Sequence, residues 1–76
     1  MTTPVLDCRG RRCPQPILEL ARHIETVDAG STIAVEADDP AAGPDIAAWC
    51  RMRRHEFLGQ TLAEDGTPRF LVRRRR

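Results

Sequence analysis

The feature of this sequence with the clearest chemical potential is a cysteine followed by two prolines, Cys13-Pro14-Gln15-Pro16, directly before an apolar stretch. A residue before proline is pushed toward extended backbone geometry, which is what a helix N-cap requires, and proline fits the first helical position. We therefore predict that Cys13 caps a helix that begins at Pro14. The free N–H groups of Gln15 and Ile17 would then lie near the sulfur, at the positive end of the helix dipole.

This placement favours the thiolate form of Cys13, which is the nucleophilic form of a cysteine. A thiolate can attack a sulfane sulfur, hold it as a persulfide and pass it to another thiolate. No separate general base is needed, because a cysteine with a lowered pKa is already largely ionised near neutral pH. The motif thus predicts nucleophilic sulfur chemistry at Cys13, although a cysteine that only caps a helix would have the same sequence.

The elements that must position this cysteine alternate between strands and helices. Short apolar or alternating runs predict strands at residues 5–8, 32–38, 56–64 and 68–74, and Asp65-Gly66 predicts a hairpin turn between the last two. An apolar stripe of Ile17, Leu20, Ala21 and Ile24 predicts a first helix at residues 14–27. A second amphipathic helix is expected after the break at Gly43-Pro44, ending near Arg54.

This order predicts an α+β fold, namely a two-layer α/β sandwich with βαβαββ order. Its mixed four-stranded sheet would carry both helices on one face and leave the other face open. Leu58 and Leu62 of the third strand, and Phe70 and Val72 of the fourth, are expected to face the helices. Arg69, Leu71 and Arg73 would face the open side. A chain of 76 residues has room for one modest core, so we expect a single domain over residues 1–76.

Several short segments resemble, in the same order, the landmarks of the TusA/SirA-like sulfur-carrier family. The first are Leu6-Asp7, Gly10 and Cys13-Pro14-Gln15-Pro16, and the resemblance covers almost the whole chain. Arg11 is a departure, because the family usually has an apolar residue there. The later landmarks are Ala37-Asp38-Asp39-Pro40, Asp45-Ile46, Cys50, His55-Glu56, Asp65-Gly66, Pro68 and Phe70-Leu71-Val72.

The resemblance implies a small sulfurtransferase that carries sulfur as a persulfide on Cys13, with Pro14 and Pro16 shaping the site. It further implies a cysteine desulfurase or a rhodanese-like sulfurtransferase as donor and a protein as acceptor. Members of the family serve tRNA thiolation, cofactor biosynthesis or sulfur oxidation. From the residues themselves, we expect Gly10 to permit the turn into the site, with the backbone N–H of Gln15 near the sulfur. Contacts to partners would come from the arginines of the same loop, Arg9, Arg11 and Arg12.

We expect the carrier to need no cofactor and no metal, and its composition indicates the class of protein. The chain is 41% hydrophobic and 30% charged with a net charge of +1, which is typical of a globular protein. Its start has no apolar signal segment and no stretch is long enough for a membrane span, so we expect no membrane association. Three cysteines in such a chain predict reduced thiols in the cytoplasm. We expect a monomer when the carrier is free.

Two other uses of the cysteines remain open. Cys8, Cys13, Cys50 and His55 are enough ligands for tetrahedral zinc, but their spacing lacks the tight knuckles of structural zinc sites. Alternatively, Cys8 and Cys13 could form a disulfide as a redox sensor, although a reducing cytoplasm favours a buried or idle Cys8. Cys50 lies beside Trp49 on the apolar face of the second predicted helix, where a small core residue is expected.

A binding module that uses the arginines is the other functional class. Arg51, Arg53 and Arg54 cluster near the end of the second predicted helix, and residues 73–76 are four consecutive arginines. Such a surface could contact RNA or regulate an acidic protein partner. Because the chain has only three aromatic residues, it offers no platform on which bases could stack, and we do not expect direct nucleic-acid binding.

Overall fold

The structure is a computed structural model that describes residues 3–76, so the first two positions of the predicted domain lie outside the described residues. Its elements follow the predicted βαβαββ order, with one additional turn of 3₁₀ helix, η1, after the first α-helix. They are β1 (Val5–Asp7), α1 (Gln15–His23), η1 (Ile24–Thr26), β2 (Thr32–Glu36), α2 (Ala42–Arg53), β3 (Glu56–Leu62) and β4 (Pro68–Arg73). Neither α-helix in the described range has the length and apolar character that crossing a bilayer requires.

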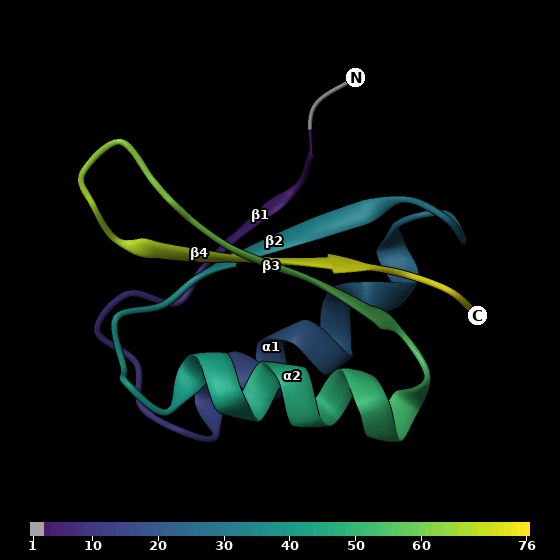
Figure 1. Cartoon of the computed structure of the whole chain (residues 1–76), viewed down its shortest axis with the longest axis horizontal. Coiled ribbons are helices and arrows are strands. Elements are labelled where there is room, and N and C mark those ends of the chain that lie inside the picture. The colour runs from purple at the N-terminus through teal and green to yellow at the C-terminus, as the bar shows by residue number, and fades with distance from the viewer. Residues whose placement is uncertain (1–2) are drawn as a thin grey trace.

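The four strands form one mixed sheet in the order β1-β2-β4-β3. β1 is parallel to β2, whereas β4 is antiparallel to both of its neighbours, β2 and β3. Both helices lie on the same side of the sheet (Figure 1). The predicted fold class, a two-layer α+β sandwich with the helices on one face, is therefore confirmed.

The core lies between the helices and the sheet. Leu20 and Ile24 from the first helical segment are buried, and Ile17 and Ala21 pack against them, so the predicted apolar stripe is confirmed. The second helix contributes Ile46, Trp49 and Cys50, and the sheet contributes Ile33, Val35, Phe70 and Val72.

Both helices begin elsewhere than predicted. The first starts at Gln15 with Pro14 as its N-cap, and regular α-helix ends at His23. The second starts at Ala42, so Gly43 and Pro44 lie inside its first turn and do not break the chain before it. Proline costs nothing there, because the first N–H groups of a helix have no intrahelical partner. Gly43 packs on the sheet, where an added Cβ would come within 3.0 Å of the Phe70 ring.

The prediction for the apolar face of β3 is wrong. Leu58 is 37% exposed and Leu62 is 61% exposed, whereas Phe57 packs against the core. A β-bulge between Phe57 and Gly59 interrupts the alternation of side chains, and Gly59 has a φ of 125°. Leu62 is the last residue of β3, next to the turn that joins β3 to β4.

The open face of the sheet carries ion pairs. Glu36 of β2 is only 8% exposed and accepts two hydrogen bonds from Arg69 of β4, at 3.0 and 2.7 Å. Arg73 donates to Glu56 of β3 at 3.2 Å. Arg69 and Arg73 are thus on the open side of the sheet, as predicted. The side chain of Arg69 covers Glu36.

Candidate functional site

Cys13 is exposed and lies in the loop between β1 and α1. The expectation that it caps α1 is wrong, because Pro14 occupies the N-cap. The peptide bond between Cys13 and Pro14 is cis. The N–H of Gln15, expected near the sulfur, donates instead to the Arg12 carbonyl at 2.8 Å. The thiol therefore stands one residue before the N-cap of α1 and lacks the Gln15 backbone donor.

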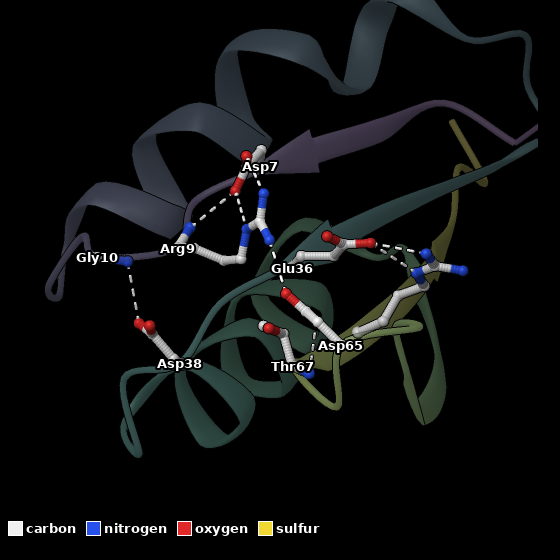
Figure 2. Close-up of polar contacts among 8 residues, drawn as sticks. Asp7, Arg9, Gly10, Glu36, Asp38, Asp65 and Thr67 are labelled. Carbon is white, nitrogen blue, oxygen red and sulfur yellow. Dashed lines mark hydrogen bonds and ion pairs between the residues drawn. The ribbon is translucent and has the colours of Figure 1, made fainter.

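The loop that carries Cys13 is held by two consecutive aspartates between β2 and α2. Asp38 accepts a hydrogen bond from the Gly10 N–H at 3.1 Å (Figure 2), and Gly10 makes the predicted turn with a φ of 77°. Asp39 accepts from the Cys13 N–H at 2.8 Å and from the Ala41 N–H at 3.0 Å. These two N–H groups lower the pKa of Asp39, which keeps it ionised. The cysteine loop is thereby fixed to the start of α2.

A third acid, Asp45 in the first turn of α2, acts on the sulfur itself. A hydrogen bond to Asp45 is the largest cause of a raised pKa at the Cys13 thiol, followed by desolvation and the negative charges of Asp45 and Asp39. Within residues 3–76, the Oδ2 atom of Asp45 is buried without a hydrogen-bond partner, which leaves this carboxylate unused acceptor capacity. The raised pKa of the thiol is opposite in direction to the lowered pKa that the helix start led us to expect for Cys13. The neighbouring carboxylates favour the protonated thiol.

The three arginines predicted to contact partners differ in their surroundings. Arg9 lies between two carboxylates and pairs with Asp7 at 2.9 Å and Asp65 at 2.7 Å (Figure 2). Its hydrogen bonds lower the pKa of Asp7 to about 2. Arg11 makes one long pair with Glu19, at 3.5 Å, and none of the ion pairs in residues 3–76 includes Arg12. Arg9 thus ties the loop to the β3–β4 turn, while Arg11 and Arg12 present charge beside the thiol.

The other two thiols are buried. Cys8 and Cys50 are each 1% exposed, and all three cysteines are free. Burial raises the pKa of Cys8 and raises that of Cys50 to about 11. Across residues 3–76 there is no group of three or more His, Cys, Asp or Glu side chains that could hold a metal ion, so the zinc ligands considered from the sequence are not brought together. Cys13 is the accessible thiol among the three.

A shallow groove of about 320 Å³ lies beside the site. It is lined by residues 10–12 of the cysteine loop and residues 38–40 of the aspartate loop, and Cys13 does not line it. Cys13 is exposed beside this groove, so its thiol can be reached from outside the protein. Such a thiol suits a reaction with another macromolecule, which can bring its own reacting group to the surface.

The sequence did not predict that Asp38 and Asp39 hold the cysteine loop or that Asp45 acts on the thiol. Asp39 is 26 residues from Cys13, so no local periodicity connects the two. An aspartate shortly before a helix is a capping signal, and that signal could have identified Asp39 as a residue at the start of α2. It could not have shown that the same carboxylate also binds the cysteine loop.

The sequence and the fold each resemble those of known proteins. The sequence model of a family described as sulfurtransferase TusA matches residues 5–74. The crystal structure of a SirA-like protein from Desulfitobacterium hafniense superimposes with a TM-score of 0.80 at 15% identity, covering 97% of this chain and 100% of that one. At that identity the structural likeness supports the fold alone. The family match covers the cysteine loop and the three aspartates Asp38, Asp39 and Asp45. The chain belongs to the sulfurtransferase TusA family, a family of sulfur carriers.

Proposed function

We propose that this protein is a sulfur carrier in which Cys13 alternates between a thiol and a persulfide. The observation that carries the proposal is the exposure of Cys13 on a braced loop within the family match, while Cys8 and Cys50 are buried. A sulfur atom that is to pass between proteins must be reachable from outside, and burial of the other two thiols prevents that.

The transfer needs no cofactor and no net oxidation. The ionised sulfur of Cys13 attacks the terminal sulfur of a persulfide on the donor. A new S–S bond forms on Cys13, the S–S bond of the donor breaks, and the donor cysteine leaves as a thiolate. The proton lost from Cys13 balances the one gained by the leaving thiolate. Delivery repeats this step, with the thiolate of the acceptor attacking the outer sulfur on Cys13.

The rest of the site holds and presents the sulfur. Asp38 and Asp39 fix the loop through backbone N–H groups, and Gly10 provides its turn. Pro14 and Pro16 restrict the backbone at the start of α1. Arg11 and Arg12 add positive charge at the surface that a partner would approach. Gln15 contributes its N–H to the loop and not to the sulfur.

We propose that this sulfur transfer takes place in the cytoplasm, where a reducing environment keeps the three free thiols from forming disulfides. A cysteine desulfurase or rhodanese-like protein would load the carrier, and an acceptor protein in tRNA thiolation, cofactor biosynthesis or sulfur oxidation would unload it. The family as a whole works with sulfur donors and acceptors, which supports this role for the present chain.

Mass spectrometry after incubation with a cysteine desulfurase and cysteine tests the proposal. We expect the wild-type protein to gain the mass of one sulfur atom, located by peptide mapping on Cys13. Cys13→Ser should abolish this gain, whereas the matched control Cys50→Ser should retain it. Persulfide found chiefly on Cys8 or Cys50 in the folded protein would contradict the assignment.

A further inference from the structure

A second surface feature lies away from Cys13, at the C-terminal ends of the two α-helices. It is an open groove of about 460 Å³ between the end of the first helical segment, the last turn of α2 and the chain after β4. The lining residues that matter here are Trp49, Met52, Arg53, His55, Arg74 and Arg76.

The arginines of this groove take part in no side-chain ion pair among the described residues. None of the ion pairs in residues 3–76 includes Arg53, Arg74 or Arg76. The Arg74 guanidinium donates to three main-chain oxygens, those of Arg76 at 2.6 Å, Val27 at 2.6 Å and Glu25 at 3.4 Å, which fix its position. Glu25 is the one acidic side chain that lines the groove. The balance of charge in the groove is therefore positive.

His55 lines the groove, and its pKa responds to the positive charge of the arginines there. Its ring stacks on Trp49 with a centroid distance of 5.3 Å, and its Nδ1 accepts the Arg75 N–H at 3.1 Å. Burial lowers the pKa of His55, and the charges of Arg74, Arg53 and Arg76 lower it further. An anion bound among these arginines would offset their charges and raise that pKa.

We propose that this groove is a docking site for an acidic segment of a protein partner. Met52, which is 72% exposed, adds an apolar contact of the kind that protein segments use. RNA fits less well. Trp49 is only 6% exposed and is already stacked on His55, so it leaves no aromatic face for bases, and the whole chain has a net charge of only +1.

The groove is separate from the thiol. The aspartates that contact Cys13 lie before and within the first turn of α2, whereas Met52 and Arg53 lie in its last turn. A helix of 12 residues is about 18 Å long, so the groove and the aspartates at the site lie at opposite ends of α2. The inference goes beyond sulfur transfer, and it would hold even if Cys13 carried no sulfur.

The test uses the fluorescence of Trp49, the only tryptophan of the chain, while the full-length protein is titrated with hexaglutamate. We expect a saturable change in emission that weakens with added salt, and no change with hexaglutamine. The Arg53→Ala variant should weaken binding by about threefold to fivefold, the size expected for an exposed ion pair. The Arg51→Ala variant is the matched control, because Arg51 lies in the same last turn of α2 outside the groove lining, and it should bind as the wild type does.

An NMR pH titration of His55 supplies a second measurement. Hexaglutamate should raise the pKa of His55 in the wild-type and Arg51→Ala proteins, and raise it less in Arg53→Ala. Equal weakening by Arg51→Ala and Arg53→Ala would overturn the proposal, and so would an unchanged His55 titration. Tighter binding of a single-stranded RNA of equal charge would assign the groove to nucleic acid instead. The Cys13→Ser variant should bind hexaglutamate normally, which separates this result from the sulfur-loading test.

Discussion

The Oδ2 atom of Asp39 lies 2.8 Å from the backbone nitrogen of Cys13, while the Oδ1 atom of the same carboxylate lies 3.0 Å from that of Ala41. One side chain thus joins the loop that carries the thiol to the start of α2. The position of the sulfur depends on this second helix as much as on the helix that follows the cysteine in sequence.

Replacing Asp39 should therefore affect stability and sulfur uptake together. Asp39→Ala removes both acceptors and should lower the free energy of unfolding by about 1–2 kcal/mol. Asp39→Asn retains one acceptor oxygen and should cost about half as much. Urea unfolding measures the stability, and the rate of persulfide formation measures uptake. An Asp39→Ala protein with unchanged stability and unchanged loading would show that this carboxylate does not brace the loop.

Asp45 should set the protonation of the thiol. The Asp45 carboxylate raises the pKa of Cys13, chiefly through its hydrogen bond with the thiol and also through its negative charge, which disfavours the thiolate. Asp45→Asn removes that charge, so the pKa of Cys13 should fall and alkylation at neutral pH should become faster. The measurement is the alkylation rate of Cys13 against pH, with Cys50 replaced by Ser in both proteins. Glu64→Gln, which changes an exposed acid near the hairpin turn, serves as the control and should leave the curve in place.

Cys8 should be dispensable for sulfur transfer. It is buried with a raised pKa, which makes it a poor partner for a regulatory disulfide with Cys13. Cys8→Ala should retain sulfur transfer under reducing conditions and should lose about 1 kcal/mol of stability from the truncated core side chain. Loss of transfer in a Cys8→Ala protein that remains folded would favour a mechanism with two cysteines.

Two arginines on the open face of the sheet should differ in their contribution to stability. Arg69 covers the nearly buried Glu36, so Arg69→Ala leaves a desolvated carboxylate without its partner and should cost about 2 kcal/mol. Arg73 pairs with the more exposed Glu56, and Arg73→Ala should cost less than about 1 kcal/mol. Denaturant unfolding of both variants makes the comparison. Equal losses would mean that burial of Glu36 does not strengthen its pair.

The protein should lose stability in acid over a defined range. Hydrogen bonds from Arg9 lower the pKa of Asp7 from 3.8 to about 2, and the pKa values of Asp39 and Asp65 are lowered too. A carboxylate whose pKa is lower in the folded than in the unfolded protein stabilises the fold at pH values above its unfolded-state pKa. This stabilisation is lost as the pH falls through its folded-state pKa. The urea midpoint should therefore fall between pH 4 and pH 2, and it should fall less in Asp7→Asn. Identical pH profiles for the two proteins would exclude Asp7 as a source of the acid sensitivity.

The sequence predicted the elements of the fold well because each has a local periodic signal. The stripe of Leu20 and Ile24 and the alternation of Phe70 and Val72 were enough to assign the core of one helix and one strand. The same alternation failed in β3, where the bulge at Gly59 shifts the side chains and exposes Leu58. Nothing in the local pattern marks that bulge apart from the glycine itself.

The site was predicted less completely than the fold. Cys13 and its prolines form a contiguous motif, so the reacting atom could be named from sequence. Its electrostatic surroundings come from Asp39 and Asp45, which only the packing of α2 against α1 brings to the sulfur. Helix-start reasoning from the motif alone therefore predicted the wrong direction for the pKa of Cys13.

Because Cys13 is exposed on a loop that Asp38 and Asp39 hold in place, its sulfur is positioned to enter the site of another protein. The groove beside the site is lined by residues 10–12 and 38–40 and not by Cys13, so this groove does not enclose the sulfur. If Cys13 carries a persulfide as proposed, the donor or acceptor enzyme that binds the loop must select the carrier and shield the persulfide from water. One such carrier could then bind several enzymes in turn, and the relative affinities of these enzymes for the carrier would decide which of them receives the sulfur.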